Sequence, residues 1–211
     1  MVHIPHLLIE PSDGETVALS PEQRLHIEKV LRYKEGLALS YTDGAGLVGS
    51  GTWVGGRLVR GEERLIPERP IVTIAVAPPK AKDRQRLIVE KLGELGVSRL
   101  IWLTTRFGQV RPPTPARTRA WAIAALEQSR SAFLLEVGSG SLEDLPDVVL
   151  ADAAGGALDV SVQTLAIGPE GGWHPDEMIG HPTARLSEQV LRTETAAIVG
   201  GALLRGPHMV T

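Results

Sequence analysis

Cysteine is absent from the 211 residues of this chain. Its absence excludes disulfides, thiolate metal sites and cysteine nucleophiles together. Long apolar runs are missing as well: the longest, Ile71–Pro79 and Ala196–Leu204, are about half of the ~20 residues that span a bilayer. The N-terminal segment has no basic stretch followed by a long apolar one, so we expect no secretory signal. We therefore expect a cytoplasmic protein without a membrane partner.

Patterns of metalloproteins and hydrolases are also lacking. The six histidines show no metal-ligand spacing, and we expect no metal site. No Gly-x-Ser-x-Gly nucleophile elbow occurs, which leaves hydrolase chemistry without support. What is present resembles an ordinary globular protein, because 43% of the residues are hydrophobic and 22% are charged.

The formal net charge of −3 conceals a division of the chain by charge sign. Residues 69–130 carry twelve basic and four acidic side chains, whereas residues 131–211 carry three basic and eleven acidic ones. A basic block inside a nearly neutral chain is typical of a site for a polyanion. The alternative, which charge alone leaves equally open, is that these cations lie on exposed helix faces and pair with the acidic third.

The first 68 residues have the pattern of a small β-rich module. Short apolar segments separated by Asp-Gly and Gly-Gly turns occupy residues 37–41, 47–53 and 57–59. They predict hairpins within a small barrel or rolled sheet. A helix is predicted from its N-cap Ser20 to about Leu31. Its predicted apolar face consists of Leu25, Ile27, Val30 and Leu31. Residues 62–70, charged and interrupted twice by proline, are predicted to form a linker.

From Ile71 onward, buried strands alternate with amphipathic helices. Strands are predicted at 71–77, 99–104, 148–150 and 165–167, and helices at 83–95, 117–131 and 193–204. This alternation predicts an α/β domain with a mostly parallel sheet and helices on both faces. Gly200 and Gly201 lie inside the last helix, where each costs about 1 kcal/mol relative to alanine. We expect the close approach of another backbone to compensate.

A glycine-rich segment, IGPEGGWHP, follows the strand at 165–167. In an open α/β sheet, ligands bind beyond the carboxyl ends of the strands, and a loop of this composition exposes main-chain groups to a flat ligand. The segment is neither a P-loop nor a Gly-x-Gly-x-x-Gly fingerprint. Taken alone, GPEGG is more typical of a tight surface turn than of a ligand-binding loop.

A second unusual segment, LRTETA, opens the last predicted helix. Thr193 or Thr195 can cap the helix, and Glu194 in its first turn suits the helix dipole. Arg192 is not explained in this way, because a cation is disfavoured at a helix N-terminus. We therefore expect Arg192 to face an anion or to pair with a carboxylate such as Glu170.

Together these segments resemble one family. The chain carries, in order, HIEKVLR at 26–32, TDGAG at 42–46, KLGELGV at 91–97, EQSR at 127–130, IGPEGG at 167–172 and LRTETA at 191–196. This series resembles the bacterial 16S ribosomal RNA uracil-N3 methyltransferases over nearly the whole chain. The pair GPEGG and LRTETA is specific, whereas ELGV alone would not be.

The resemblance implies a fold and a cofactor. It implies an N-terminal PUA-like β-barrel that binds RNA (residues 1–68) and a C-terminal SPOUT α/β methyltransferase domain with a deep trefoil knot (residues 69–211). It also implies a homodimer that binds S-adenosyl-L-methionine. The residues that it assigns to the cofactor are Ile167, Gly168, Pro169, Glu170, Gly171, Gly172, Leu186, Leu191, Arg192, Thr193 and Glu194.

The resemblance further implies methylation of a uridine N3 in 16S rRNA, within the small ribosomal subunit. Arg192, with Arg106, would stabilise negative charge on a uracil oxygen. Glu170 or Glu194 would accept the proton or position Arg192. The side chains expected to bind RNA phosphates are Lys80, Lys82, Arg84, Arg106, Arg111 and Arg130.

Several positions depart from the family pattern. Ser131 replaces a common arginine, Ser187 replaces a usual glycine, and Leu135 lies near a usual proline. The usual arginine near the N-terminus is missing, with His6 the nearest polar residue, and Lys80 and Lys82 bracket the position of one expected lysine. Two alternatives therefore remain: a SPOUT methyltransferase for a different RNA or base, and a non-catalytic RNA-binding assembly protein.

Overall fold

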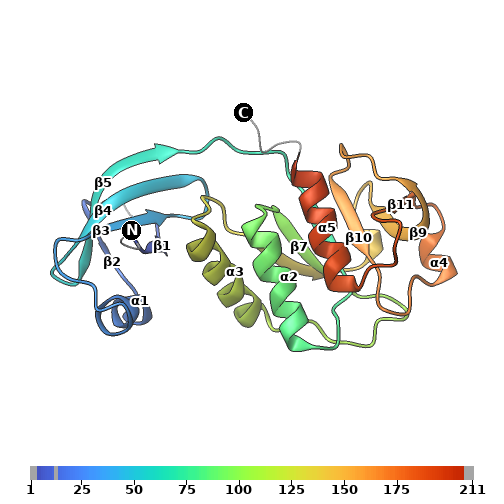
Figure 1. The fold of residues 1–211 in the computed structure, drawn as a ribbon, viewed down its shortest axis with the longest axis horizontal. Coiled ribbons are helices and arrows are strands. Elements are labelled where there is room, and N and C mark those ends of the chain that lie inside the picture. The colour runs from blue at the N-terminus through green and yellow to red at the C-terminus, as the bar shows by residue number, and fades with distance from the viewer. Residues whose placement is uncertain (1–3, 12–13, 207–211) are drawn as a thin grey trace. The chain divides into compact units, whose positions relative to one another are not determined.

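A computed structural model describes residues 4–11 and 14–206. By their internal contacts these residues form two compact units (Figure 1). The first unit comprises the residues up to Glu68 together with Leu126–Leu134, and the second comprises Arg69–Ala125 together with the residues from Leu135 onward. The chain therefore changes unit at three points.

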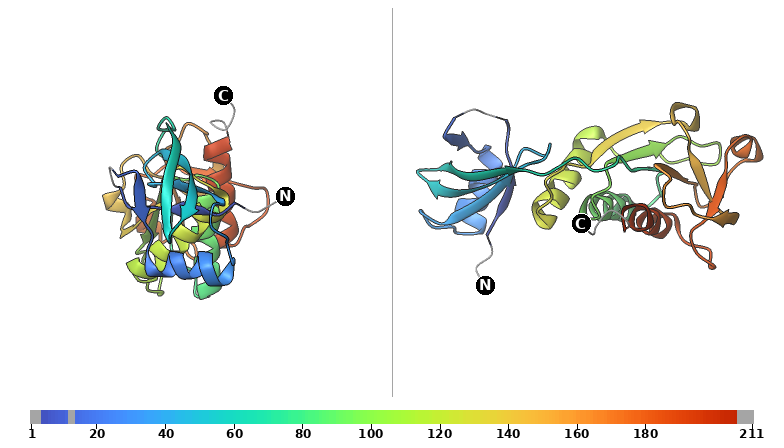
Figure 2. Two further views of the ribbon diagram at one scale, coloured as in Figure 1. Left: turned by 90° about the vertical axis from the view of Figure 1, so that its left-hand side faces the viewer. Right: turned by 90° about the horizontal axis from the view of Figure 1, so that it is seen from above.

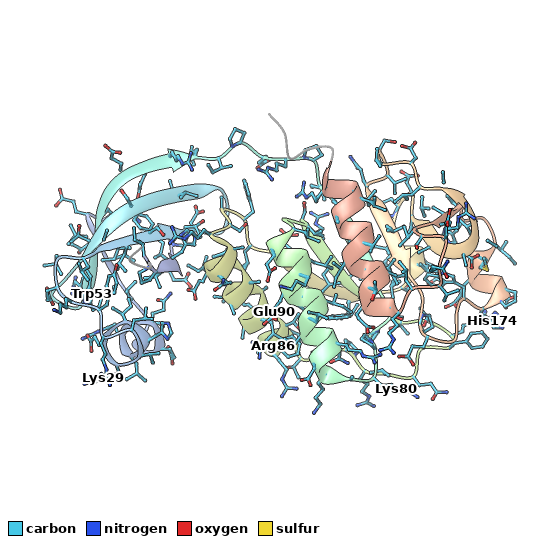
Figure 3. All side chains as sticks on the ribbon, in the orientation of Figure 1. Lys29, Trp53, Lys80, Arg86, Glu90 and His174 are labelled. Carbon is cyan, nitrogen blue, oxygen red and sulfur yellow. The ribbon has the colours of Figure 1, made fainter. Side chains whose placement is uncertain are left out.

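The first unit is built on a five-stranded sheet. Its spatial order is β1-β3-β4-β5-β2, and β1 pairs with β3 in parallel while the other pairings are antiparallel. The strands are β1 (His6–Leu8), β2 (Thr16–Ala18), β3 (Ala38–Thr42), β4 (Leu47–Val54) and β5 (Arg57–Leu65). Trp53, labelled in Figure 3, and Tyr41 are the largest side chains of its buried core.

The predicted N-cap is confirmed, but the helix that follows differs from the prediction. Ser20 Oγ accepts a hydrogen bond from the backbone N–H of Gln23 at 3.2 Å, and α1 (Pro21–Leu25) follows it. The chain then winds as a π-helix, η1 (His26–Val30), in which the Leu31 N–H donates to the His26 carbonyl. This wider winding breaks the 3.6-residue period, and of the predicted apolar face only Ile27 is buried.

The predicted linker at 62–70 is partly wrong. Residues 62–65 belong to β5, where Glu63, Arg64 and Leu65 pair with Gly49, Val48 and Leu47 of β4. Charged side chains mark this part of β5 because its residues from Gly61 to Leu65 are exposed to solvent. An exposed strand needs no apolar alternation to be held by backbone hydrogen bonds.

The second unit contains a six-stranded sheet in the order β11-β9-β10-β6-β7-β8, and all five of its pairings are parallel. Its strands are β6 (Thr73–Val76), β7 (Arg99–Leu103), β8 (Glu136–Gly140), β9 (Val149–Ala157), β10 (Thr164–Ile167) and β11 (Thr183–Arg185). The parallel sheet confirms the α/β prediction. The four residues of β6 and of β10 are all buried, as expected for strands at the centre of such a sheet.

The long helices are α2 (Lys82–Glu94), α3 (Pro115–Ser129), whose last four residues group with the first unit, and α5 (Thr193–Arg205). Seen from above in Figure 2, α2 and α5 lie side by side on one face of the sheet. The other face is covered by shorter pieces around Trp173: the 3-10 helix η2 (Leu142–Asp144) and α4 (Pro175–Met178). Helices therefore lie on both faces of the sheet, as the alternation predicted, but those on the second face are short.

The two glycines of α5 make close contacts, but with side chains rather than with another backbone. A Cβ at Gly200 would lie 2.5 Å from Leu165 Cδ2, and one at Gly201 would lie 2.8 Å from Leu92 Cδ2. The glycines thus let α5 pack closely on β10 and α2.

Within residues 4–11 and 14–206, none of the helices combines the length and the apolar character that crossing a bilayer requires.

Candidate active site

A pocket of about 630 Å³ lies in the second unit, and we call it the main pocket. Most of its walls come from three segments that are distant in sequence: residues 151–153 of β9, residues 167–170, 172 and 173 at the end of β10 and after it, and nine residues between 185 and 196, up to the first turn of α5. Arg84 of α2 completes the lining. Nine residues predicted to bind a cofactor line it: Ile167, Gly168, Pro169, Glu170, Gly172, Leu186, Leu191, Arg192 and Thr193.

The IGPEGG loop takes its path from two local constraints. The Trp173 indole N–H donates to the Ala151 carbonyl at 3.0 Å, which fixes the ring at the wall of the pocket. Gly168 lies under this ring, since a Cβ there would be 3.0 Å from the indole. Gly172 has a φ of +76° and closes a turn with the Pro169 carbonyl, a conformation that glycine adopts without strain.

The start of α5 is tied to the same loop. Thr193 is buried and its hydroxyl donates to the Gly168 carbonyl at 3.4 Å. The Ile167 carbonyl at the end of β10 accepts from the Ala77 N–H at 3.0 Å. Contacts to Ala77, the residue after β6, and to α5 therefore fix where the loop leaves the sheet and enters the pocket.

Arg84 joins the two predicted carboxylates. Its guanidinium lies 3.4 Å from Glu170 Oε1 and 3.3 Å from Glu194 Oε1. The Glu194 side chain is only 10% exposed and does not line the main pocket, whereas Glu170 is 60% exposed and does. Of the two predicted carboxylates, only Glu170 is positioned to reach a bound ligand.

Arg192 is exposed at the wall of the main pocket and is the N-cap of α5. Its side chain makes no hydrogen bond or ion pair within the part of the chain that the structure describes. The expected pairing of Arg192 with Glu170 is therefore wrong, because Arg84 takes that carboxylate. The guanidinium of Arg192 remains available for an anion.

A second hollow, of about 370 Å³, adjoins the main pocket. Pro169, Glu170 and Thr193 line both, and Gly171 lines only the second hollow. The remaining wall comes from residues 77–80, between β6 and α2, and from residues 107–110, which follow β7. Sequence reasoning did not identify this hollow, nor Ala151, Asp152 and Ala153 of the main pocket, because their positions depend on the strand order.

The basic residues predicted to bind phosphates lie in different surroundings. Arg106 pairs with Asp176 at 2.8 Å, and Lys80 lines the second hollow. Lys82 and Arg111 are exposed and have no ion pair among residues 4–11 and 14–206. Arg130 groups with the first unit and donates to the Ile4 carbonyl at 2.6 Å.

Three of the positions that depart from the family pattern have clear local roles. His6 is buried in the first unit, where its ring bonds to Ser40 Oγ at 2.9 Å and to the Ser131 carbonyl at 3.4 Å. Burial lowers the pKa of its imidazole. Ser131 Oγ accepts from the Phe133 N–H, and Ser187 Oγ accepts from the Gln189 N–H at the edge of the main pocket.

No metal-ligating cluster occurs among the described residues.

The chain is similar to known proteins in sequence and in fold. The RNA methyltransferase domain family matches residues 67–205. A ribosomal RNA small subunit methyltransferase E from Mycobacterium bovis is 31% identical over 225 residues, covering 90% of this chain and 86% of the relative. The crystal structure of a ribosomal RNA small subunit methyltransferase E from Neisseria gonorrhoeae, bound to S-adenosyl methionine, has a TM-score of 0.80 at 19% identity and covers 97% of this chain and 98% of its own.

Proposed function

This chain belongs to the RNA methyltransferase domain family, and we propose that it uses S-adenosyl-L-methionine to methylate N3 of a uridine in the 16S rRNA of the small ribosomal subunit. The observation that carries the proposal is the main pocket, which brings the IGPEGG and LRTETA segments together around one space. The Mycobacterium bovis relative supports an rRNA substrate by its name.

The residues of the main pocket fit an adenosyl cofactor. Its volume lies within the range of about 300–1,000 Å³ that small-ligand sites occupy. The IGPEGG loop offers main-chain N–H and C=O groups to a flat base, and Leu186 and Leu191 supply apolar surface opposite. The Neisseria gonorrhoeae protein of the same fold holds this cofactor. When bound, the cofactor supplies an electrophilic methyl group on a sulfonium.

The protein's own residues would prepare the uracil. Its N3 is a weak nucleophile until the imide proton leaves, and the resulting negative charge spreads onto the carbonyl oxygens. The guanidinium of Arg192, at the wall of the main pocket, would stabilise that charge. Glu170, on the wall shared by the two hollows, accepts the N3 proton. Loss of the proton would leave N3 nucleophilic toward the methyl group that a bound cofactor would supply. Because N3 is engaged in base pairing, the uridine must be unpaired or flipped out.

Arg192→Ala tests this assignment in single-turnover methylation. Loss of one preorganised donor to a developing anion should lower the rate by about 10²–10³-fold. Arg192→Lys keeps the charge but not the fork of donors, and it should retain part of the rate. Affinity for the cofactor, measured by calorimetry, serves as the control for binding. A rate near that of the unchanged protein would remove Arg192 from the mechanism.

The proposal extends to the organisation of the chain. We assign residues 1–68 to a PUA-like barrel that adds RNA contact surface, and residues 69–211 to a SPOUT domain with a trefoil knot that forms a homodimer. The outer face of α5 supports a dimer, since Ile198, Val199, Ala202 and Leu203 form a partly exposed apolar stripe there. Sedimentation equilibrium should give a mass of two chains.

The substrate is tested by methylation in vitro of assembled 30S particles and of free rRNA, followed by mapping of the modified base. We expect 3-methyluridine in 16S rRNA. Another base or another RNA would favour a methyltransferase of different specificity. Failure to bind S-adenosyl-L-methionine in calorimetry would favour a non-catalytic RNA-binding protein.

A further inference from the structure

The second hollow lies where a methyl acceptor would meet the main pocket. The two spaces share a wall made by Pro169, Glu170 and Thr193. Methyl transfer requires the acceptor atom to approach the donor in line, so both molecules must occupy adjoining sites. If the cofactor occupies the main pocket, the second hollow offers an adjoining space for the acceptor.

The lining of the second hollow suits a nucleotide. Phe107 presents a ring that is 48% exposed, and its contact with the His174 ring, at a centroid distance of 5.3 Å and an angle of 63°, holds it in place. Aromatic rings exposed in this way are platforms on which unpaired bases stack. The buried Pro79 adds apolar wall, and Lys80 adds an exposed cation beside it (Figure 3).

We propose that the second hollow receives the acceptor nucleotide of the RNA, with its base against Phe107 and its phosphate near Lys80. The proposal rests on the proposed methyltransferase function and deepens it by naming the site of the substrate. Glu170, at the shared wall, then lies beside both the base and the cofactor. The apolar ring, the cation and the carboxylate each have a partner in a uridine nucleotide: the base face, the phosphate and the N3 proton.

Kinetics with RNA provide the first test. Phe107→Leu removes the ring but keeps an apolar side chain, and it should raise the RNA KM by about 5- to 150-fold, the loss of one base–aromatic stack. Phe107→Tyr keeps a ring and should lose far less. Lys80→Gln should raise the RNA KM as well. Val160→Ala, which changes a 45% exposed apolar residue outside both hollows, is the matched control.

Calorimetry separates this proposal from the proposed function. The affinity for S-adenosyl-L-methionine should stay within about twofold in Phe107→Leu and Lys80→Gln. An unchanged protein that binds no cofactor or methylates no RNA would contradict the proposed function itself. An active protein in which both variants keep the RNA KM of the unchanged chain would overturn the acceptor site alone.

Photo-crosslinking tests the site without any substitution in the protein. RNA that carries 5-iodouridine at the mapped nucleotide is irradiated in complex with the full chain. A crosslink to Phe107 or to residues 108–110 supports the proposal. Crosslinks confined to residues outside the second hollow would overturn it.

Discussion

Arg84 shows how one side chain can hold a site together without being its reactive group. It comes from α2 and contacts carboxylates on the IGPEGG loop and on the first turn of α5. One Glu194 oxygen, Oε2, is buried without a hydrogen-bond partner among the described residues, so this carboxylate depends on Arg84 for compensation of its charge.

Arg84→Ala should lower the free energy of unfolding by about 1–3 kcal/mol, the cost of leaving a buried polar or charged group uncompensated. Glu194→Gln removes the charge that needs compensation, so the double variant should be more stable than the sum of the two single losses indicates. Urea unfolding of the four proteins measures this coupling. Strictly additive losses would contradict the role of Arg84 as the counterion.

His6 makes the stability of the first unit depend on pH. Burial lowers the pKa of its imidazole below the ordinary value of 6.5, so the folded chain favours the neutral ring and the unfolded chain binds the proton more readily. The stability that the neutral ring contributes is therefore present above about pH 6.5 and is lost as the pH falls below it.

Between pH 7.5 and 5.5, the free energy of unfolding should fall by more in the unchanged protein than in His6→Gln. The comparison cancels the contributions of the other histidines, and urea unfolding at several pH values provides the measurement. Parallel pH profiles for the two proteins would show that His6 does not titrate differently in the folded and unfolded states.

At the residue scale, the sequence predicted those features of the site that depend only on neighbouring residues. Glycines and proline after a buried strand indicated the loop at 167–172, and the structure places nine of the predicted residues at one pocket. The partner of Arg192 was mispredicted because the competing cation, Arg84, is distant in sequence. The burial of Glu194 depends on which face of α5 meets α2, and a single helix does not specify that face.

At the scale of elements, β9 and β11 form one wall of the main pocket through an unusually close approach. A Cβ at Gly155 would lie 2.7 Å from the backbone nitrogen of Ala184, whereas a Cβ at the next residue, Gly156, would meet nothing within 4 Å. The register of the two strands shifts between Thr183 and Ala184, at this contact. Gly155 is thus required where two backbones nearly touch.

Gly155→Ala should destabilise the protein by about 1–3 kcal/mol, because the contact is with backbone and cannot be relieved by a side-chain rotation. Gly156→Ala is the matched control on the same strand, and it should change stability by no more than about 0.5 kcal/mol. Gly155→Ala should also weaken cofactor binding in calorimetry, since the strands on either side of the contact line the main pocket. Equal effects of the two substitutions would refute the argument from close approach.

Sequence analysis missed β8 and β11, two strands whose side chains show no strand pattern and which are held in the sheet by backbone pairing. β8 reads Glu-Val-Gly-Ser-Gly and β11 has three residues, so neither has an apolar pattern. Both are edge strands, held by β7 and β9. The central strands, β6 and β10, were predicted because they are apolar apart from one threonine each, and all of their residues are buried.

At the scale of the whole molecule, the structure bears on the two interpretations of the basic block. Arg84, Arg99 and Arg106 pair with carboxylates of residues 131–211, so part of the block is neutralised internally. Lys82 and Arg111 are exposed without such partners among the described residues. Both interpretations therefore apply, each to different side chains.

Binding of rRNA should weaken steeply with salt, and Lys82→Gln and Arg111→Gln should each reduce the slope of log K against log salt by about one. Lys91→Gln, on the same helix as Lys82, is the control, since its ammonium already lies 2.8 Å from the Glu94 carboxylate. Filter binding across a salt series measures the slopes. A flat response of the unchanged protein would assign the whole block to internal pairing.

The strand order also has a consequence for how the chain reaches its native state. β6 and β10 are neighbours at the middle of the sheet, yet β7, α3, β8 and β9 all lie between them in the sequence. Closing so long a loop costs entropy before any pairing compensates for it, which makes folding slow. During translation, the apolar β6 must wait for residues 164–167 to leave the ribosome, and until then its unpaired edge is a site for aggregation that a chaperone would have to shield.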